Sequence, residues 1–167
     1  MSKAFTKDDV SGTPFVVPSR APLPPGVTNY VTPRGMEALR QELRELEAKR
    51  ARLTGADGDV HGELAMINAR IAEVYDRVAT AVVVDPTAQP QDEARLGAIV
   101  RVRAENGDER IFQIVGVDEA DVEHGYIAFI APLARALLGK QVGDLATVRT
   151  PRGEEDLEII SIEYPQA

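Results

Sequence analysis

The chain has 167 residues with a net charge of −8; 44% are hydrophobic and 5% aromatic, and there is no cysteine or tryptophan. This length fits one ordinary domain or two small ones, and the lack of cysteine excludes disulfides and thiolate metal sites. Because no apolar run approaches the roughly 20 residues of a membrane span, and residues 1–20 lack a secretory-signal pattern, we expect a cytoplasmic protein that enters no membrane.

The first segment, residues 1–31, contains five of the eleven prolines and no sustained hydrophobic period. The run Pro22-Leu-Pro-Pro-Gly26 favours an extended chain that packs on nothing. We therefore predict a disordered, proline-rich arm over residues 1–31.

Residues 32–80 have the pattern of a helical hairpin. Thr32 is a good N-cap, and Pro33 suits the first helical position. Aliphatic residues then recur at spacings of three, four and seven on both sides of a glycine-rich turn at residues 54–62. Such stripes predict two antiparallel helices joined along one seam, as in a coiled coil. The seam residues are Leu39, Leu43, Leu46 and Leu53 before the turn, and Leu64, Ile67, Ile71, Val74 and Val78 after it.

A pair of helices packed flat on a core would carry the same stripes. Between Gly35 and Leu53, however, five basic residues are interleaved with four acidic ones. This distribution is typical of a helix with one dry edge and an otherwise solvated surface. The charges therefore favour a hairpin that projects from the rest of the molecule.

Residues 81–95 read as a short strand followed by a linker, and residues 96–167 as a separate β-rich domain. From Leu96 the hydrophobic period becomes two, and Asn106-Gly107 is a strong hairpin signal. Residues 126–130 form a further expected strand, residues 132–138 a short helix, and residues 145–150 and 157–164 a final hairpin. Strands with one short helix between them indicate an α+β fold with a mostly antiparallel sheet.

The negative charge lies in this β-rich domain. Residues 1–80 carry 11 basic and 11 acidic side chains, whereas residues 81–167 carry 8 and 16. An acidic surface is expected to bind nucleic acid poorly on its own, because such binding depends on cationic side chains. The acidic excess has two alternative explanations. It keeps the protein soluble, or it complements a basic surface on a partner protein and steers association with that partner.

The order of these elements over residues 30–164 resembles the Gre family of bacterial transcription elongation factors. The hairpin matches at Val31-Thr-Pro-Arg-Gly35, Leu39 and Glu42-Leu43. The β-rich domain matches at Ile114-Val-Gly-Val-Asp-Glu119, Ala131-Pro-Leu-Ala-Arg-Ala-Leu-Leu-Gly-Lys140, Val142-Gly-Asp144, Thr150-Pro151, Gly153 and Ile162-Glu-Tyr164. Ala131 is a departure, because the family usually carries serine before this proline.

This resemblance implies that the β-rich domain has an FKBP-like fold without prolyl isomerase activity, and that it docks at the rim of the RNA polymerase secondary channel. The residues implied as polymerase contacts are Pro132, Arg135, Leu137, Leu138 and Gly139. Core packing is an equally good explanation of Leu137 and Leu138. Arg135 is harder to explain as core, because arginine is almost never fully buried unless it is paired.

The resemblance also implies a role for the hairpin tip. Gre factors place an Asp and a Glu from the tip inside the polymerase active centre, where they help to hold a second Mg²⁺ and a water that cleaves the backtracked transcript. The candidates here are Asp57, Asp59 and Glu63, with Asp59 and Glu63 as shared metal ligands. The glutamate expected three residues after Asp59 falls on Gly62, and Glu63 lies one position beyond. Asp57 and Asp59 are equally well explained as turn residues beside Gly58.

The expected function is that of a monomeric polymerase-binding elongation factor with no cofactor of its own. It would stimulate the polymerase's own cleavage activity, meeting the transcript 3′ end only indirectly, and would not itself be an enzyme. Gly35 to Leu53 spans roughly 28 Å as a helix, about two turns shorter than in family members. A non-cleaving channel regulator that competes with cleavage factors is therefore the alternative. A prolyl isomerase is disfavoured, because residues 96–167 contain only four aromatic residues.

Overall fold

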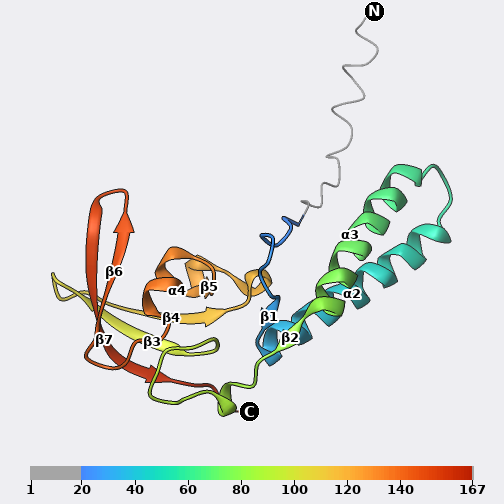
Figure 1. Cartoon of the computed structure of the whole chain (residues 1–167). Helices are drawn as coiled ribbons and strands as arrows, with labels where there is room; N and C mark the ends of the chain where they lie inside the picture. Colours follow the sequence, from blue (N-terminus) through green and yellow to red (C-terminus); the bar gives the residue numbers. More distant parts are fainter. Residues whose placement is uncertain (1–19, 167) are drawn as a thin grey trace, which may run out of the picture.

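A long helical hairpin and a curled β-sheet with one short helix make up the computed structural model, which describes residues 20–166. The hairpin projects away from the sheet, as Figure 1 shows. We call residues 96–166 the head. The helices are α2 (Pro33–Thr54), α3 (His61–Thr80) and α4 (Pro132–Leu137). The strands are β1 (Tyr30–Val31), β2 (Val82–Val83), β3 (Ile99–Ala104), β4 (Glu109–Val115), β5 (Tyr126–Ala128), β6 (Leu145–Thr150) and β7 (Gly153–Glu163). Three 3-10 turns are η1 (Pro86–Ala88), η2 (Val117–Glu119) and η3 (Val122–His124).

Helix α2 begins as the sequence predicts. The Thr32 hydroxyl accepts a hydrogen bond from the Gly35 amide at 3.0 Å, and Pro33 occupies the first helical turn. The helix ends at Thr54, where the Gly55 amide donates back to the Ala51 carbonyl. A side-chain cap satisfies one of the amides that the start of a helix leaves without a partner.

The predicted seam holds the two helices together. Leu39, Ile67 and Val74 are buried in it, and further aliphatic side chains of both helices are partly buried beside them. Towards the tip the seam is less covered, because Leu53 and Leu64 are only half-buried. The projecting antiparallel hairpin is confirmed.

The two ends of the hairpin meet in a small parallel sheet, in which Tyr30 pairs with Val82 and Val31 with Val83. Val31 is buried between the hairpin and the head. The prediction of a disordered arm over residues 1–31 is therefore wrong for residues 20–31, while residues 1–19 lie outside the described residues. The order comes from contacts with residues about 50 positions away, such as the hydrogen bond from the Asn29 side chain to the Arg77 backbone carbonyl at 2.9 Å.

The head is a five-stranded sheet in the order β5-β4-β3-β7-β6. All neighbours are antiparallel except β4 and β5, which run parallel. At the predicted turn, Gly107 takes a φ of +93°, a conformation that glycine adopts without strain. Helix α4 packs on the sheet through Ala134 and Leu137, both fully buried in the core. The predicted α+β class, with an antiparallel sheet and one short helix, is confirmed.

Two strands differ from the prediction. β7 begins at Gly153, four residues earlier than expected, because it pairs with β6 from the turn onward. β5 ends at Ala128, two residues before the predicted strand end. Among the helices of residues 20–166, none combines the length and apolarity that crossing a bilayer demands.

Candidate functional site at the hairpin tip and the head

The hairpin tip exposes all three candidate carboxylates. Asp57 and Asp59 lie on the connection between the helices, and Glu63 lies in the first turn of α3. Gly58 between the two aspartates has a φ of +99°, which a side chain would strain. One Asp59 carboxylate oxygen accepts a hydrogen bond from the His61 amide at 3.2 Å, at the start of α3. Asp59 thus stabilises the turn through this hydrogen bond, and its carboxylate remains exposed to solvent.

The tip carboxylates do not form a metal site by themselves. Within residues 20–166 there is no group of three or more His, Cys, Asp or Glu side chains that could hold a metal ion. Mg²⁺ prefers six oxygen ligands in near-octahedral geometry and is usually bound through one or two carboxylates. The tip carboxylates are therefore too few to hold such an ion alone.

Position 62, where a glutamate was expected from the resemblance, is a glycine inside α3. A Cβ built on Gly62 meets nothing within 4 Å. Glu63, one position on, is rotated by about 100° around the helix relative to that site. The tip therefore offers its third carboxylate in a different direction.

The second candidate surface is α4 and the turn after it. Pro132 and Arg135 are exposed, and within the described part of the chain the Arg135 guanidinium makes no hydrogen bond or ion pair. Gly139 is exposed with a φ of +82°, and its amide donates to the Ala94 carbonyl at 2.8 Å. This surface is held in place and open to a partner.

The two leucines of this segment differ. Leu138 is partly buried against the core, whereas Leu137 is 0% exposed. The expectation that Leu137 contacts a partner directly is therefore wrong, and core packing explains it. Ala131 is the N-cap of α4 and makes no capping hydrogen bond, because the alanine side chain has no acceptor.

A cluster that the sequence did not predict connects the hairpin to the head, and we call it the joint. Glu119 of η2 accepts hydrogen bonds from the Thr32 hydroxyl at 2.6 Å and from Arg34 Nε at 3.0 Å. Arg34 also donates to the Tyr126 hydroxyl at 2.6 Å and stacks 4.0 Å from the centre of its ring. A Cβ on Gly35 would lie 2.4 Å from a Glu119 carboxylate oxygen, so any larger residue would have to push the Glu119 side chain aside.

The joint unites two motifs that are far apart in the sequence. Val31-Thr-Pro-Arg-Gly35 opens the hairpin, and Ile114-Val-Gly-Val-Asp-Glu119 crosses the head. A Cβ on Gly116 would lie 2.6 Å from the Tyr30 carbonyl oxygen, so these backbones also touch closely. Those two motifs were the only signal of the joint in the sequence. Neither motif contains a local pattern that predicts its contact with the other.

Asp118, next to Glu119, belongs to a second cluster. Its carboxylate lies 2.6 Å from Arg20 Nη1 and 3.4 Å from Arg77 Nε. Arg20 Nη2 also lies 2.6 Å from Glu42 of α2. Burial alone would lower the pKa of Arg20, but hydrogen bonds and charges from Asp118 and Glu42 outweigh it and raise the pKa.

The four aromatic residues of the head have structural contacts. Phe112 is buried in the core, and Tyr126 lies under Arg34. Phe129 packs edge-on against Tyr30 at 5.8 Å between ring centres. The buried Tyr164 hydroxyl accepts from the Arg95 amide at 2.9 Å and donates to the Glu93 carbonyl. Burial raises the pKa of Tyr164. These roles give no support to an aromatic-lined isomerase pocket.

Sequence comparisons with known proteins agree with one another. The family model described as "Transcription elongation factor, GreA/GreB, C-term" matches residues 89–164. The transcription elongation factor GreA of Alkalilimnicola ehrlichii is 38% identical over 152 residues, which cover 80% of this chain and 96% of the relative. GreB of Neisseria meningitidis serogroup B is 36% identical over 153 residues, covering 81% and 94%. Among solved structures, Thermus thermophilus Gfh1, a GreA factor homolog, is 26% identical with a TM-score of 0.39, covering 82% of this chain and 99% of that one.

In the alignment with Alkalilimnicola ehrlichii GreA, the aligned part of this chain is shorter than that of the relative. The alignment runs over 152 positions, yet 80% of this chain's 167 residues is only about 134. About 18 positions of the relative therefore have no counterpart inside the aligned part of this chain.

Proposed function

Because this chain belongs to the GreA/GreB family of transcription elongation factors, we propose that it binds bacterial RNA polymerase with its head and inserts its hairpin into the secondary channel. The observation that carries this proposal is the projecting hairpin with exposed carboxylates at its tip. In this arrangement the head remains outside as the anchor, and the joint attaches the start of the hairpin to it.

The tip would act on the polymerase active centre through Asp59, assisted by Asp57 or Glu63. When bound there, Mg²⁺ would stabilise the attacking and leaving oxygens during hydrolysis of the transcript. The tip carboxylates would supply oxygen ligands and hold the attacking water by hydrogen bonds. The polymerase remains the enzyme, and this protein changes how fast it cleaves.

The head would contact the channel rim through the open surface of α4. Pro132, Arg135 and Gly139 are exposed there, and Leu138 is partly so. Leu137 would contribute by fixing α4 on the sheet, because its side chain lies wholly in the core.

Transcript cleavage in stalled elongation complexes tests the proposal. We expect Asp59→Asn to lower the cleavage rate at least about tenfold, since loss of a metal-site interaction typically costs 10- to 100-fold, with polymerase affinity unchanged. Glu47→Gln removes the same charge from an exposed site on α2 and should cleave like the wild type. Wild-type protein that binds the polymerase and leaves backtracked RNA intact would remove the cleavage role.

A second candidate function is channel occupancy without cleavage. It is favoured by the glycine at position 62, where the resemblance implies a glutamate. In this case the protein would displace a genuine cleavage factor from the polymerase and reduce cleavage in mixed reactions. Failure to compete for the channel would exclude this alternative.

A further inference from the structure

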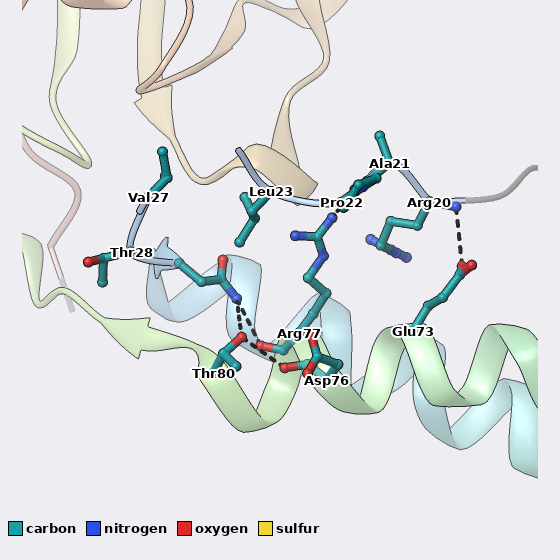
Figure 2. Close-up of a pocket in the computed structure, with 11 residues that line it drawn as sticks. Arg20, Ala21, Pro22, Leu23, Val27, Thr28, Glu73, Asp76, Arg77 and Thr80 are labelled. Carbon is teal, nitrogen blue, oxygen red and sulfur yellow. Dashed lines mark hydrogen bonds between the residues drawn. The ribbon is translucent and has the colours of Figure 1, made fainter. Parts of the chain in front are cut away.

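Residues 20–29 form a segment without helix or strand, with one turn at Pro25-Gly26, that we call the strap. It lies along α3, where Ala21, Pro22 and Leu23 pass over the helix and Arg77 extends towards Ala21 (Figure 2). The Arg77 guanidinium donates to the Ala21 carbonyl, and Asn29 donates to the Arg77 carbonyl at 2.9 Å and to Thr80 at 3.3 Å. The strap is therefore attached to α3 near both of its ends.

Arg20 connects the strap to three different parts of the molecule. Its guanidinium contacts Glu42 on α2 and Asp118 on the head, each at 2.6 Å. Its backbone amide donates to Glu73 on α3 at 3.2 Å. A single residue therefore bridges both helices and the head.

The contacts of Arg20 with Glu42 and Asp118 form a second attachment between hairpin and head, distinct from the joint. Glu119 binds the start of α2 at Thr32, whereas Asp118 binds Arg20, and through it Glu42. Thr32 and Glu42 are ten residues apart on α2, or roughly 15 Å along its axis. One attachment point leaves a rod free to pivot, but two separated points fix its direction.

Burial makes this second attachment more than a surface ion pair. The side chains of Arg77 and Asp118 are only 6% and 8% exposed, and that of Arg20 is 21% exposed. Exposed ion pairs contribute little, whereas breaking a buried pair leaves its partner charge without compensation. Loss of Arg20 would leave the buried Asp118 with Arg77 alone, at 3.4 Å.

We propose that the strap sets the angle between hairpin and head, and that Arg20 is the residue that links the strap to both. The proposal concerns the free protein and holds whether or not the hairpin enters a polymerase. Without the strap, the joint, the small β1–β2 sheet and the Asp118–Arg77 pair would hold the hairpin only near its base. The hairpin would then sample a range of angles.

A distance measurement between spin labels tests this inference. The chain has no cysteine, so Ala56→Cys at the tip and Arg152→Cys on the head, both exposed, take labels specifically. We expect a single narrow distance in the otherwise unchanged protein. Arg20→Ala should lose that narrow peak and give a broad distribution, and Asp118→Asn should do the same.

Two controls separate the strap from general effects of charge. Arg40→Ala removes an exposed arginine from α2 and should keep the narrow peak. Arg20→Lys should broaden the distribution partly, because one ammonium cannot reproduce the fork that contacts Glu42 and Asp118 together. Narrow peaks in both Arg20→Ala and Asp118→Asn would overturn the proposal, and so would equal broadening in Arg40→Ala.

Discussion

Glu119 shows how one side chain can define the start of a helix from outside it. Its carboxylate accepts from the Thr32 hydroxyl, while that hydroxyl accepts from the Gly35 amide. The chain of hydrogen bonds links head to helix backbone, and its strength depends on Glu119 staying close to Gly35. With its side chain only 7% exposed, Glu119 would be costly to leave without these donors.

Replacing Gly35 by alanine tests this arrangement at the level of one methyl group. In an ordinary helix the change stabilises by up to about 1 kcal/mol. At position 35 we expect destabilisation by about 1 to 3 kcal/mol, because the new Cβ displaces the Glu119 carboxylate from its donors. Urea unfolding measures the difference.

Gly62→Ala is the matched control, because Gly62 also lies in the first turn of a helix and has open space around it. We expect it to stabilise the protein slightly. Equal effects of the two substitutions would contradict the proposed role of Glu119.

At the scale of elements, the hairpin depends on its seam more than on helix propensity. An isolated helix of this length is marginal in water, so each helix needs the apolar face of the other. Ile67 is 0% exposed at the middle of the seam, while Ile71, one turn further along α3, is partly covered. The seam is thus closed at some positions and open at others.

Truncating these two isoleucines compares the positions with the same chemistry. We expect Ile67→Ala to cost about 2 to 5 kcal/mol, the range for fully buried isoleucine, and Ile71→Ala clearly less. Thermal unfolding followed by helical circular dichroism measures both. A larger loss for Ile71→Ala would show that the seam packs differently in solution.

Local patterns were enough to predict most elements. The period of two located β3 and β4, the Asn106-Gly107 turn joined them, and Thr32-Pro33 began α2 at the right place. The tip carboxylates became candidates through the resemblance to Gre factors, and the glycine-rich turn that carries Asp57 and Asp59 was recognised from its local composition. These features depend on residues within a few positions of one another.

Long-range features could not be predicted in the same way. The strap looked disordered because its prolines form no periodic pattern, and its partners are on α2, α3 and η2. Glu119 was noticed as part of a motif, but its partner Thr32 lies 87 positions away. In α4, two successive leucines left open which one faces the core, and only packing assigns Leu137 to it.

The charge distribution belongs to the molecule as a whole. The acidic excess of residues 81–167 lies in the linker and head, the part proposed to dock, and not in the hairpin. If this charge complements a basic rim, attraction speeds the encounter and is weakened by salt, since the screening length is about 10 Å at 0.1 M ionic strength. If it serves solubility alone, association is insensitive to salt.

We expect the association rate constant with RNA polymerase to fall roughly tenfold from low to high salt, with a smaller change in the dissociation rate. Stopped-flow binding provides both constants. Neutralising two exposed head carboxylates with Glu105→Gln and Glu123→Gln should flatten the salt dependence. An association rate constant that does not change with salt would leave solubility as the explanation of the acidic excess.

The parallel pairing of β1 and β2 has a consequence for how such molecules can vary. Because both ends of the hairpin leave from one spot, matched insertions or deletions in α2 and α3 lengthen or shorten it without altering its root. Each whole turn shifts the apex by about 5.4 Å. Mutation can therefore change the length of the hairpin without changing how its base is attached to the head.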